Sequence, residues 1–207
     1  MKIFLIDVDN TICPFQPTAE LYKNTLLRTN WAKYALPGYF MIILLKLFWW
    51  SPAVVTWQRK LIMGLLAAVD KSSLERASEE IAARVMVSYE QGFKSILDSF
   101  RQPGDKIFLL THCPSSISRK IAAGLKFDGE YSINIERKPV VLDKVKIINK
   151  IRTEHRGEEI FYFADDLIDL GPLLAADRGL LINASSFTRS IARLFFSRVK
   201  IWDWQAR

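Results

Sequence analysis

The chain has 207 residues, 50% of them hydrophobic, which is enough to bury a sizeable core and excludes an intrinsically disordered protein. Its formal net charge is +7, but Lys and Arg are spread among acidic residues without long basic runs, so no nucleic-acid partner is expected. Phosphorylated substrates and anionic membrane surfaces are natural partners for this charge. Two cysteines are too few for a disulfide framework, and no secretory signal pattern precedes the first apolar segment, so the expected location is cytoplasmic.

The first predicted element is a short buried strand, the continuous apolar run of residues 3–6. Asp7 and Asp9 follow this run and therefore lie at its carboxyl end, the edge of an open α/β sheet where ligands bind. Two carboxylates at this edge suit a cation or phosphate chemistry. Asp also favours turns through side-chain to backbone hydrogen bonds, so the pair taken alone is equally compatible with a simple strand end.

Residues 14–103 are expected to form an all-helical insertion. Residues 19–34 carry apolar side chains at helical spacing. A polar amphipathic helix is expected to begin at Ser72 or Ser73 and to run towards Phe100. Because no strand pattern interrupts this stretch, it departs from the alternation of strands and helices in the rest of the chain.

A hydrophobic segment, residues 36–69, lies in the middle of this insertion, and Lys46 is the only charged residue in its first part, residues 36–55. It does not predict a membrane-spanning helix, because a span needs about 20 uninterrupted apolar residues and Lys46 and two prolines interrupt this one. Two interpretations stay open. The segment packs as a helical core, or it contacts lipid through Trp49 and Trp50, in which case the protein is peripheral on the cytoplasmic face of a membrane.

Strands and helices alternate from residue 104 onwards. The sequence predicts strands at 106–111, 160–164 and 179–183, and helices at 115–125, 144–152 and 170–178. This alternation predicts an α/β fold with a doubly wound parallel sheet and right-handed crossovers.

Polar residues recur at the predicted strand ends. Asp165, Asp166 and Asp169 follow the 160–164 strand, Thr111 ends the 106–111 strand, and Lys144 begins a predicted helix. Together with the first pair, the strand ends present five carboxylates, a density of like charge that destabilises the fold unless a hard cation neutralises it. Mg²⁺ is the cation expected there.

Four segments in this order resemble the motifs of the haloacid dehalogenase (HAD) superfamily of phosphohydrolases: DVDNT at 7–11, LLT at 109–111, Lys144, and DDLID at 165–169. The insertion between the first two motifs resembles the helical cap of that superfamily. The resemblance implies a Rossmann-like catalytic core from residues 1–13 and 104–207, with a C1-type cap from residues 14–103. Within the superfamily, the chain is similar to the phosphoserine phosphatase-like branch.

The resemblance also implies a catalytic role for four residues. Asp7 would attack phosphorus and form an aspartyl phosphate, and Asp9 would be the general acid and base. Thr111 and Lys144 would bind the phosphoryl oxygens. Lys138 and Lys146 are alternative candidates for the third motif, although only Lys144 has the helix-start position.

Further residues are expected to bind or support the metal. The implied Mg²⁺ ligands are Asp7, Asp9 and Asp165, and the supporting residues are Thr11, Asp166 and Asp169.

These motifs constrain the class of substrate less than they constrain the type of reaction. The second motif continues as THCP rather than Ser-Gly-Gly, and Gln16 stands where phosphoserine phosphatases bind an amino group, which argues against an amino-acid substrate. The hydrophobic cap is similar to that of phosphatidylglycerophosphate phosphatases, which implies a lipid phosphate or another membrane-proximal phosphomonoester. A small soluble phosphomonoester and a non-catalytic binding protein of the same fold are the alternatives.

Overall fold

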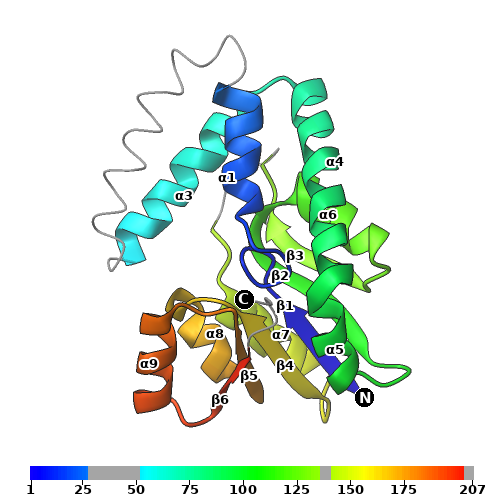
Figure 1. Ribbon diagram of the computed structural model, residues 1–207, viewed down its shortest axis with the longest axis vertical. Helices are drawn as coiled ribbons and strands as arrows, with labels where there is room; N and C mark the ends of the chain where they lie inside the picture. Colours follow the sequence, from blue (N-terminus) through cyan, green and yellow to red (C-terminus); the bar gives the residue numbers. More distant parts are fainter. Residues whose placement is uncertain (28–51, 136–140, 203–207) are drawn as a thin grey trace.

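The computed structural model describes residues 1–27, 52–135 and 141–202 (Figure 1). Its strands are β1 (Lys2–Ile6), β2 (Lys106–Pro114), β3 (Gly129–Ile133), β4 (Glu159–Ala164), β5 (Arg178–Ile182) and β6 (Val199–Trp202). Its helices are α1 (Pro17–Tyr22), η1 (Lys23–Leu27), α3 (Pro52–Ala67), α4 (Lys71–Ser88), η2 (Tyr89–Phe93), α5 (Lys94–Phe100), α6 (Ser115–Gly124), α7 (Lys144–Glu154), η3 (Leu167–Asp169), α8 (Leu170–Ala175) and α9 (Ser186–Phe195). Lys46, Trp49, Trp50 and Lys138 lie outside the described residues.

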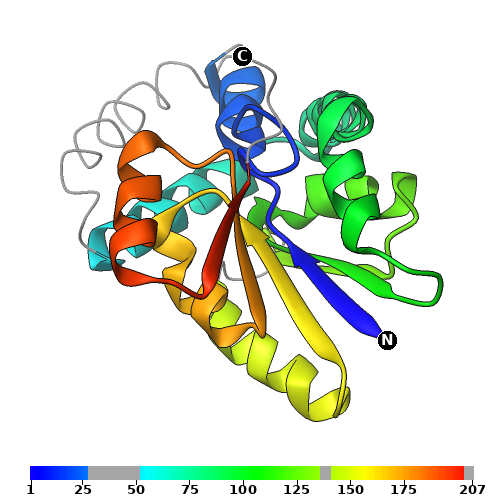
Figure 2. The same cartoon turned by 60° about the horizontal axis from the view of Figure 1, so that its bottom comes forward.

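The strands form one six-stranded sheet in the order β3-β2-β1-β4-β5-β6, and every neighbouring pair is parallel. Helices cover both faces of this sheet (Figure 2). The predicted α/β fold with a doubly wound parallel sheet is therefore confirmed. Strand β1 lies in the middle of the sheet, so the residues that follow it emerge at the centre of the carboxyl edge.

The apolar run of β1 is continuous because both of its faces are buried. Phe4 and Ile6 pack in one core cluster with residues of α4, α5 and α6. Ile3 and Leu5 point to the other face, into a second cluster with residues of α7, α8 and α9. Side chains of a strand alternate between the two faces of its sheet, so four successive apolar residues supply two to each core.

Two strands were missed by the sequence analysis, β3 and β6. Both are edge strands of the sheet, and most of their side chains are at least partly exposed. An edge strand needs no continuous apolar run, because one of its sides faces no further strand. Their sequences, GEYSI and VKIW, therefore carry a weaker strand signal than that of β1.

The polar helix of the insertion runs from α4 through η2 to α5 and ends at Phe100, as predicted. Its start was placed slightly wrong. Asp70, rather than Ser72 or Ser73, is the N-cap, and its side chain accepts a hydrogen bond of 2.9 Å from the Ser73 amide.

Helices α1 and α3 stand beyond the carboxyl ends of the strands, on the side where β1 leads into the loop that follows it (Figure 1). Among the described residues, no helix is both long and apolar enough to span a membrane.

Candidate active site

Asp7 is the first residue after β1 and is held there by backbone and side-chain contacts. Its amide donates to the Phe163 carbonyl at 2.9 Å, which extends the pairing of β1 with β4 by one residue. Its carboxylate accepts at both oxygens, from the Val8 amide at 2.7 Å and from the Lys144 ammonium at 2.8 Å. The side chain is therefore buried and fixed in one orientation.

A tight turn after Asp7 places Asp9 in the same site. The amides of Thr11 and Ile12 both donate to the Val8 carbonyl, at 3.3 and 3.2 Å, and Asn10 has a left-handed backbone with a φ of 53°. Asn is among the residues that adopt this conformation most readily, because its short side chain bonds locally. Thr11 is fully buried inside the turn.

Lys144 is the first residue of α7 and its ammonium is buried at the centre of the site. The preceding residue caps the helix, since the Asp143 side chain accepts from the Lys146 amide at 3.1 Å. Lys144 is 3% exposed and donates to Asp7, Asp169 and Tyr162, each at 2.8 Å. Lys146 points outwards with 84% of its side chain exposed. Of these two lysines, Lys144 at the start of α7 is therefore the one that reaches the other motifs.

The two aspartates of the first motif have opposite pKa shifts. Burial alone would raise the pKa of Asp7, but the Lys144 ammonium and side-chain hydrogen bonds with Asp169, Lys144 and Thr111 hold it well below its usual range. Burial and the adjacent Asp7 carboxylate raise the pKa of Asp9 to about 7. At neutral pH this arrangement keeps an ionised carboxylate beside a carboxyl that exchanges its proton readily.

The three aspartates after β4 have three different settings. Asp169 is buried against Lys144, and burial raises its pKa to about 6 in spite of that ammonium. Asp166 caps the short helix η3 by accepting from the Leu167 amide at 2.6 Å. Burial and the Asp7 carboxylate raise the pKa of Asp165 to about 8, which places Asp165 in the same electrostatic cluster as Asp7.

Strand β2 brings Thr111 and His112 to the same edge. Thr111 is fully buried, hydrogen-bonds to Asp7, and accepts from the Cys113 amide at 3.1 Å. His112 Nε2 lies 3.2 Å from the Leu142 carbonyl oxygen, so the imidazole joins β2 to the segment that leads into α7. Burial and the nearby Lys144 charge lower the pKa of His112 to about 3, so its ring is neutral at physiological pH.

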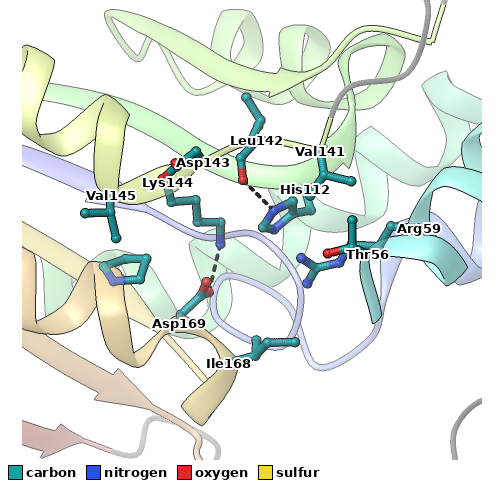
Figure 3. Close-up of a pocket in the computed structure, with 11 residues that line it drawn as sticks. Thr56, Arg59, His112, Val141, Leu142, Asp143, Lys144, Val145, Ile168 and Asp169 are labelled. Carbon is teal, nitrogen blue, oxygen red and sulfur yellow. Dashed lines mark hydrogen bonds and ion pairs between the residues drawn. The ribbon is translucent and has the colours of Figure 1, made fainter. Parts of the chain in front are cut away.

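A cavity of about 400 Å³ opens beside Lys144 and Asp169 (Figure 3). One wall comes from β2 and the α7 start, and the other comes from α3 of the insertion, through Thr56 and Arg59. The Arg59 guanidinium points towards His112 in this cavity. Arg59 was not among the predicted site residues, because helical spacing alone does not show which face of α3 meets the sheet edge.

The carboxylates of this site fit a hard divalent cation by their chemistry, although no three His, Cys, Asp or Glu side chains form a ready-made metal site in the described part of the chain. One oxygen of Asp9, Oδ1, is buried and has no hydrogen-bond partner among the described residues. Mg²⁺ is commonly held by one or two protein carboxylates, with waters and substrate phosphate completing its shell. A buried carboxylate oxygen without a partner, close to the acidic Asp7 and Asp165, is what such an ion requires.

The fold is similar to that of several solved structures. A protein of unknown function from Bordetella pertussis Tohama I aligns with a TM-score of 0.71 at 18% identity, over 96% of this chain and 97% of that one. A HAD family hydrolase from Salmonella enterica serovar Typhi aligns with a TM-score of 0.61 at 15% identity, over 91% of this chain and 65% of that one. A phosphoserine phosphatase in apo form aligns with a TM-score of 0.60 at 12% identity, over 97% and 92% of the two chains. No protein-family model and no curated protein sequence matches the chain.

The chain therefore has the fold of HAD-family hydrolases, as the four motifs predicted, and phosphoserine phosphatases are among the structures that share it. Identities of 12 to 18% establish the fold and leave the reaction to be argued from the site itself.

Proposed function

We propose that the protein is a Mg²⁺-dependent phosphomonoester hydrolase that acts through an aspartyl-phosphate intermediate. The observation that carries this proposal is the buried Asp7 carboxylate, ionised and bonded to Lys144 at 2.8 Å, beside an Asp9 carboxyl whose pKa is about 7. A nucleophile and a proton donor of this kind, two residues apart at one strand end, are the two groups that covalent phosphoryl transfer requires.

The reaction follows from these two side chains. One Asp7 oxygen forms a bond to phosphorus while the bond from phosphorus to the substrate oxygen breaks, and Asp9 gives its proton to that leaving oxygen. The Asp9 carboxylate then accepts a proton from water as the water oxygen attacks the phosphorus of the aspartyl phosphate. The bond between phosphorus and the Asp7 oxygen breaks in this second step, which releases inorganic phosphate, returns Asp7 to its carboxylate form and leaves Asp9 protonated.

Thr111 and Lys144 hold the transferred group in this proposal. The Lys144 ammonium neutralises charge on the phosphoryl oxygens, and the Thr111 hydroxyl donates a hydrogen bond to them. Asp7, Asp9 and Asp165 would hold Mg²⁺, which supplies further neutralisation of the phosphoryl charge when bound. Asp169 orients Lys144, while Asp166 and Thr11 maintain the two loops that carry the acids.

The proposed organisation is a catalytic core of residues 1–13 and 104–207 with a cap of residues 14–103. It is supported by the position of α3, whose Thr56 and Arg59 line the cavity opposite Lys144. A cationic wall supplied by the cap suits a substrate with negative charge beyond the phosphoryl group.

The proposed substrate is a lipid phosphate or another membrane-proximal phosphomonoester, and a small soluble phosphomonoester is the alternative. The support for a membrane substrate is the nearly uncharged sequence of residues 36–55, which contains Trp49 and Trp50 and is followed by the basic pair Arg59 and Lys60.

Turnover tests the catalytic proposal directly. Asp7→Asn should abolish hydrolysis of p-nitrophenyl phosphate in Mg²⁺, because an amide oxygen is a poor nucleophile. Asp9→Asn should hydrolyse slowly and accumulate an acid-stable, hydroxylamine-sensitive phosphoenzyme. Hydrolysis by Asp7→Asn at the wild-type rate would refute the assignment, and a wild-type protein without activity on a panel of phosphorylated metabolites and lipids would favour a non-catalytic binding protein.

Vesicle binding tests the membrane proposal. Trp49→Ser combined with Trp50→Ser should reduce co-sedimentation with anionic liposomes by about tenfold while p-nitrophenyl phosphate hydrolysis is unchanged. Thermal unfolding of the same variant is the control. If the variant loses much of its melting temperature and the wild type does not bind vesicles, the segment is part of the protein core. A small soluble phosphomonoester is then the better candidate substrate.

A further inference from the structure

The Lys144 ammonium has a third partner that belongs to none of the four motifs. A lysine ammonium has three N–H donors, and Lys144 directs them to Asp7 Oδ2, Asp169 Oδ2 and Tyr162 Oη, each at 2.8 Å. Two of these acceptors are carboxylates that the proposed function already uses. The third is the phenol of a fully buried tyrosine in β4.

The surroundings of Tyr162 make its hydroxyl unusual. Tyr162 pairs in register with Leu5 of β1, and its side chain lies in the core cluster on the α7 face of the sheet. The other fully or largely buried members of that cluster are aliphatic, among them Ile148 and Ile151 of α7 and Leu173 of α8. A hydroxyl placed there is stabilised only if it has hydrogen-bond partners. The ammonium at the start of α7 donates to it, and the hydroxyl also hydrogen-bonds to the Asp169 carboxyl.

A neutral acceptor at this place differs from a third carboxylate in its effect on charge. Asp7 and Asp169 already contribute two negative charges around one ammonium. A third carboxylate would weaken the positive potential that Lys144 directs at the phosphoryl oxygens, whereas phenylalanine would leave one N–H of a buried cation without an acceptor. A phenol fixes the ammonium in place and leaves its charge available. Burial keeps the pKa of Tyr162 well above its ordinary value, so the phenol stays neutral.

We propose that Tyr162 is a positioning residue for catalysis, which fixes the Lys144 ammonium from the core side of the site so that it faces Asp7 and the transferred phosphoryl group. This proposal rests on the proposed phosphatase function. Tyr162 touches neither the substrate nor the reacting atoms. It acts through the Lys144 ammonium and through Asp169, which hydrogen-bonds both to Tyr162 and to that ammonium.

The kinetic test compares two buried tyrosines. Tyr162→Phe removes the Oη acceptor and keeps the ring, and we expect kcat for p-nitrophenyl phosphate to fall about tenfold with KM changed less than twofold. The reason is that the Lys144 contact strengthens as charge develops in the transition state. Tyr89→Phe is the matched control, because Tyr89 is also buried but packs against Phe93 and Phe127 on the other face of the sheet, and it should leave both constants unchanged.

A double-mutant cycle separates positioning from a structural role. Lys144→Arg moves the cationic group away from the Tyr162 hydroxyl, so adding Tyr162→Phe to that variant should lower kcat less than twofold. Equal effects of Tyr162→Phe in both backgrounds would overturn the proposal. If the wild type is active and Tyr162→Phe and Tyr89→Phe have the same kcat, the role of Tyr162 is overturned and the phosphatase function stands. If the wild type is inactive, both proposals are overturned.

A second measurement needs no Tyr162 variant to fold. With three acceptors, the Lys144 ammonium of the wild-type protein should exchange its protons slowly and give a resolved ¹H–¹⁵N ammonium signal, assigned by its loss in Lys144→Gln. Absence of such a signal would overturn the proposed arrangement.

Discussion

The strongest quantitative prediction concerns Asp165, whose charge the fold tolerates poorly without a cation. Its pKa is raised from 3.8 to about 8, first by burial and then by the Asp7 carboxylate. Asp165→Asn keeps the size and the acceptor oxygen of the side chain but removes its ionisation. We expect this variant to be more stable than the wild type in the absence of metal, even though it loses hydrolytic activity.

The size of the effect follows from proton linkage. Below pH 3.8 the Asp165 carboxyl is protonated in both the folded and the unfolded chain, so it contributes nothing to pH dependence. As pH rises towards 8, the unfolded carboxyl is ionised while the folded one stays protonated, and the free energy of unfolding falls by about 1.4 kcal/mol per pH unit. That slope gives about 4 kcal/mol at pH 7 as an upper bound, and because Asp165 is only partly buried we expect about half of it.

The assay is urea or thermal unfolding of wild type and Asp165→Asn between pH 4 and pH 8, in EDTA and in saturating Mg²⁺. In EDTA the variant should gain about 2 kcal/mol at pH 7, or about 4 to 8 °C in melting temperature, and nothing near pH 4. Mg²⁺ at a hundred times its dissociation constant should stabilise the wild type by about 2.7 kcal/mol and the variant by less. Asp166→Asn, one residue along the chain, is the comparison variant. Because the Asp166 charge is a lesser cause of the raised Asp165 pKa, this variant should show much smaller effects. Identical pH slopes for wild type and Asp165→Asn would refute the reasoning.

Two further predictions concern packing and the cavity. Gly179→Ala should destabilise the fold by about 1 to 3 kcal/mol, because the added Cβ would lie 2.5 Å from the Leu173 carbonyl oxygen. Gly64→Ala should stabilise the fold by about 1 kcal/mol, because Gly64 lies in an exposed turn of α3 and its added Cβ would meet no atom within 4 Å. Urea unfolding measures both changes. Arg59→Ala should raise KM about tenfold for a phosphomonoester with a second anionic group and leave KM for p-nitrophenyl phosphate unchanged. Lys60→Ala, on the exposed side of α3, is the control. If Arg59→Ala changed KM by the same factor for both substrates, the orientation of Arg59 into the cavity would be contradicted.

The sequence predicts the centre of this molecule better than its edges for a physical reason. A central strand such as β1 must bury both faces, so its composition is constrained over several consecutive residues, and the acids that follow it are placed at the sheet edge by that constraint alone. The start of α7 is equally predictable, because the Asp143 cap is a local signal that precedes Lys144. Strands β3 and β6 face no such demand at the edges of the sheet, and their short mixed sequences do not distinguish them from loops.

The roles of Arg59 and Tyr162 could not be predicted from the sequence for a different reason. Each gains its role from a contact with Lys144 or its cavity, more than fifteen residues away along the chain. Tyr162 lies within a run of strand-forming aromatic residues, in which a tyrosine is unremarkable until the position of the α7 start is known. The role of Arg59 depends on which face of α3 meets the site, and the amphipathic pattern of α3 is too weak to predict that face from the sequence.

The same limit applies to the acids themselves, since a sequence does not distinguish one aspartate from another. Of the site carboxyls with shifted pKa values, Asp9, Asp165 and Asp169 are all raised, and Asp7 alone is lowered. Contact with Lys144 does not explain why the pKa of Asp7 alone is lowered, because Asp169 has that contact too. The difference lies in the hydrogen bonds: Asp7 also has side-chain hydrogen bonds with Asp169 and Thr111 that lower its pKa, and the bond between the two carboxyls raises the pKa of Asp169. These local hydrogen bonds therefore favour ionisation of Asp7 over that of the other three carboxyls, which supports the proposed roles of Asp7 as nucleophile and of Asp9 as proton carrier.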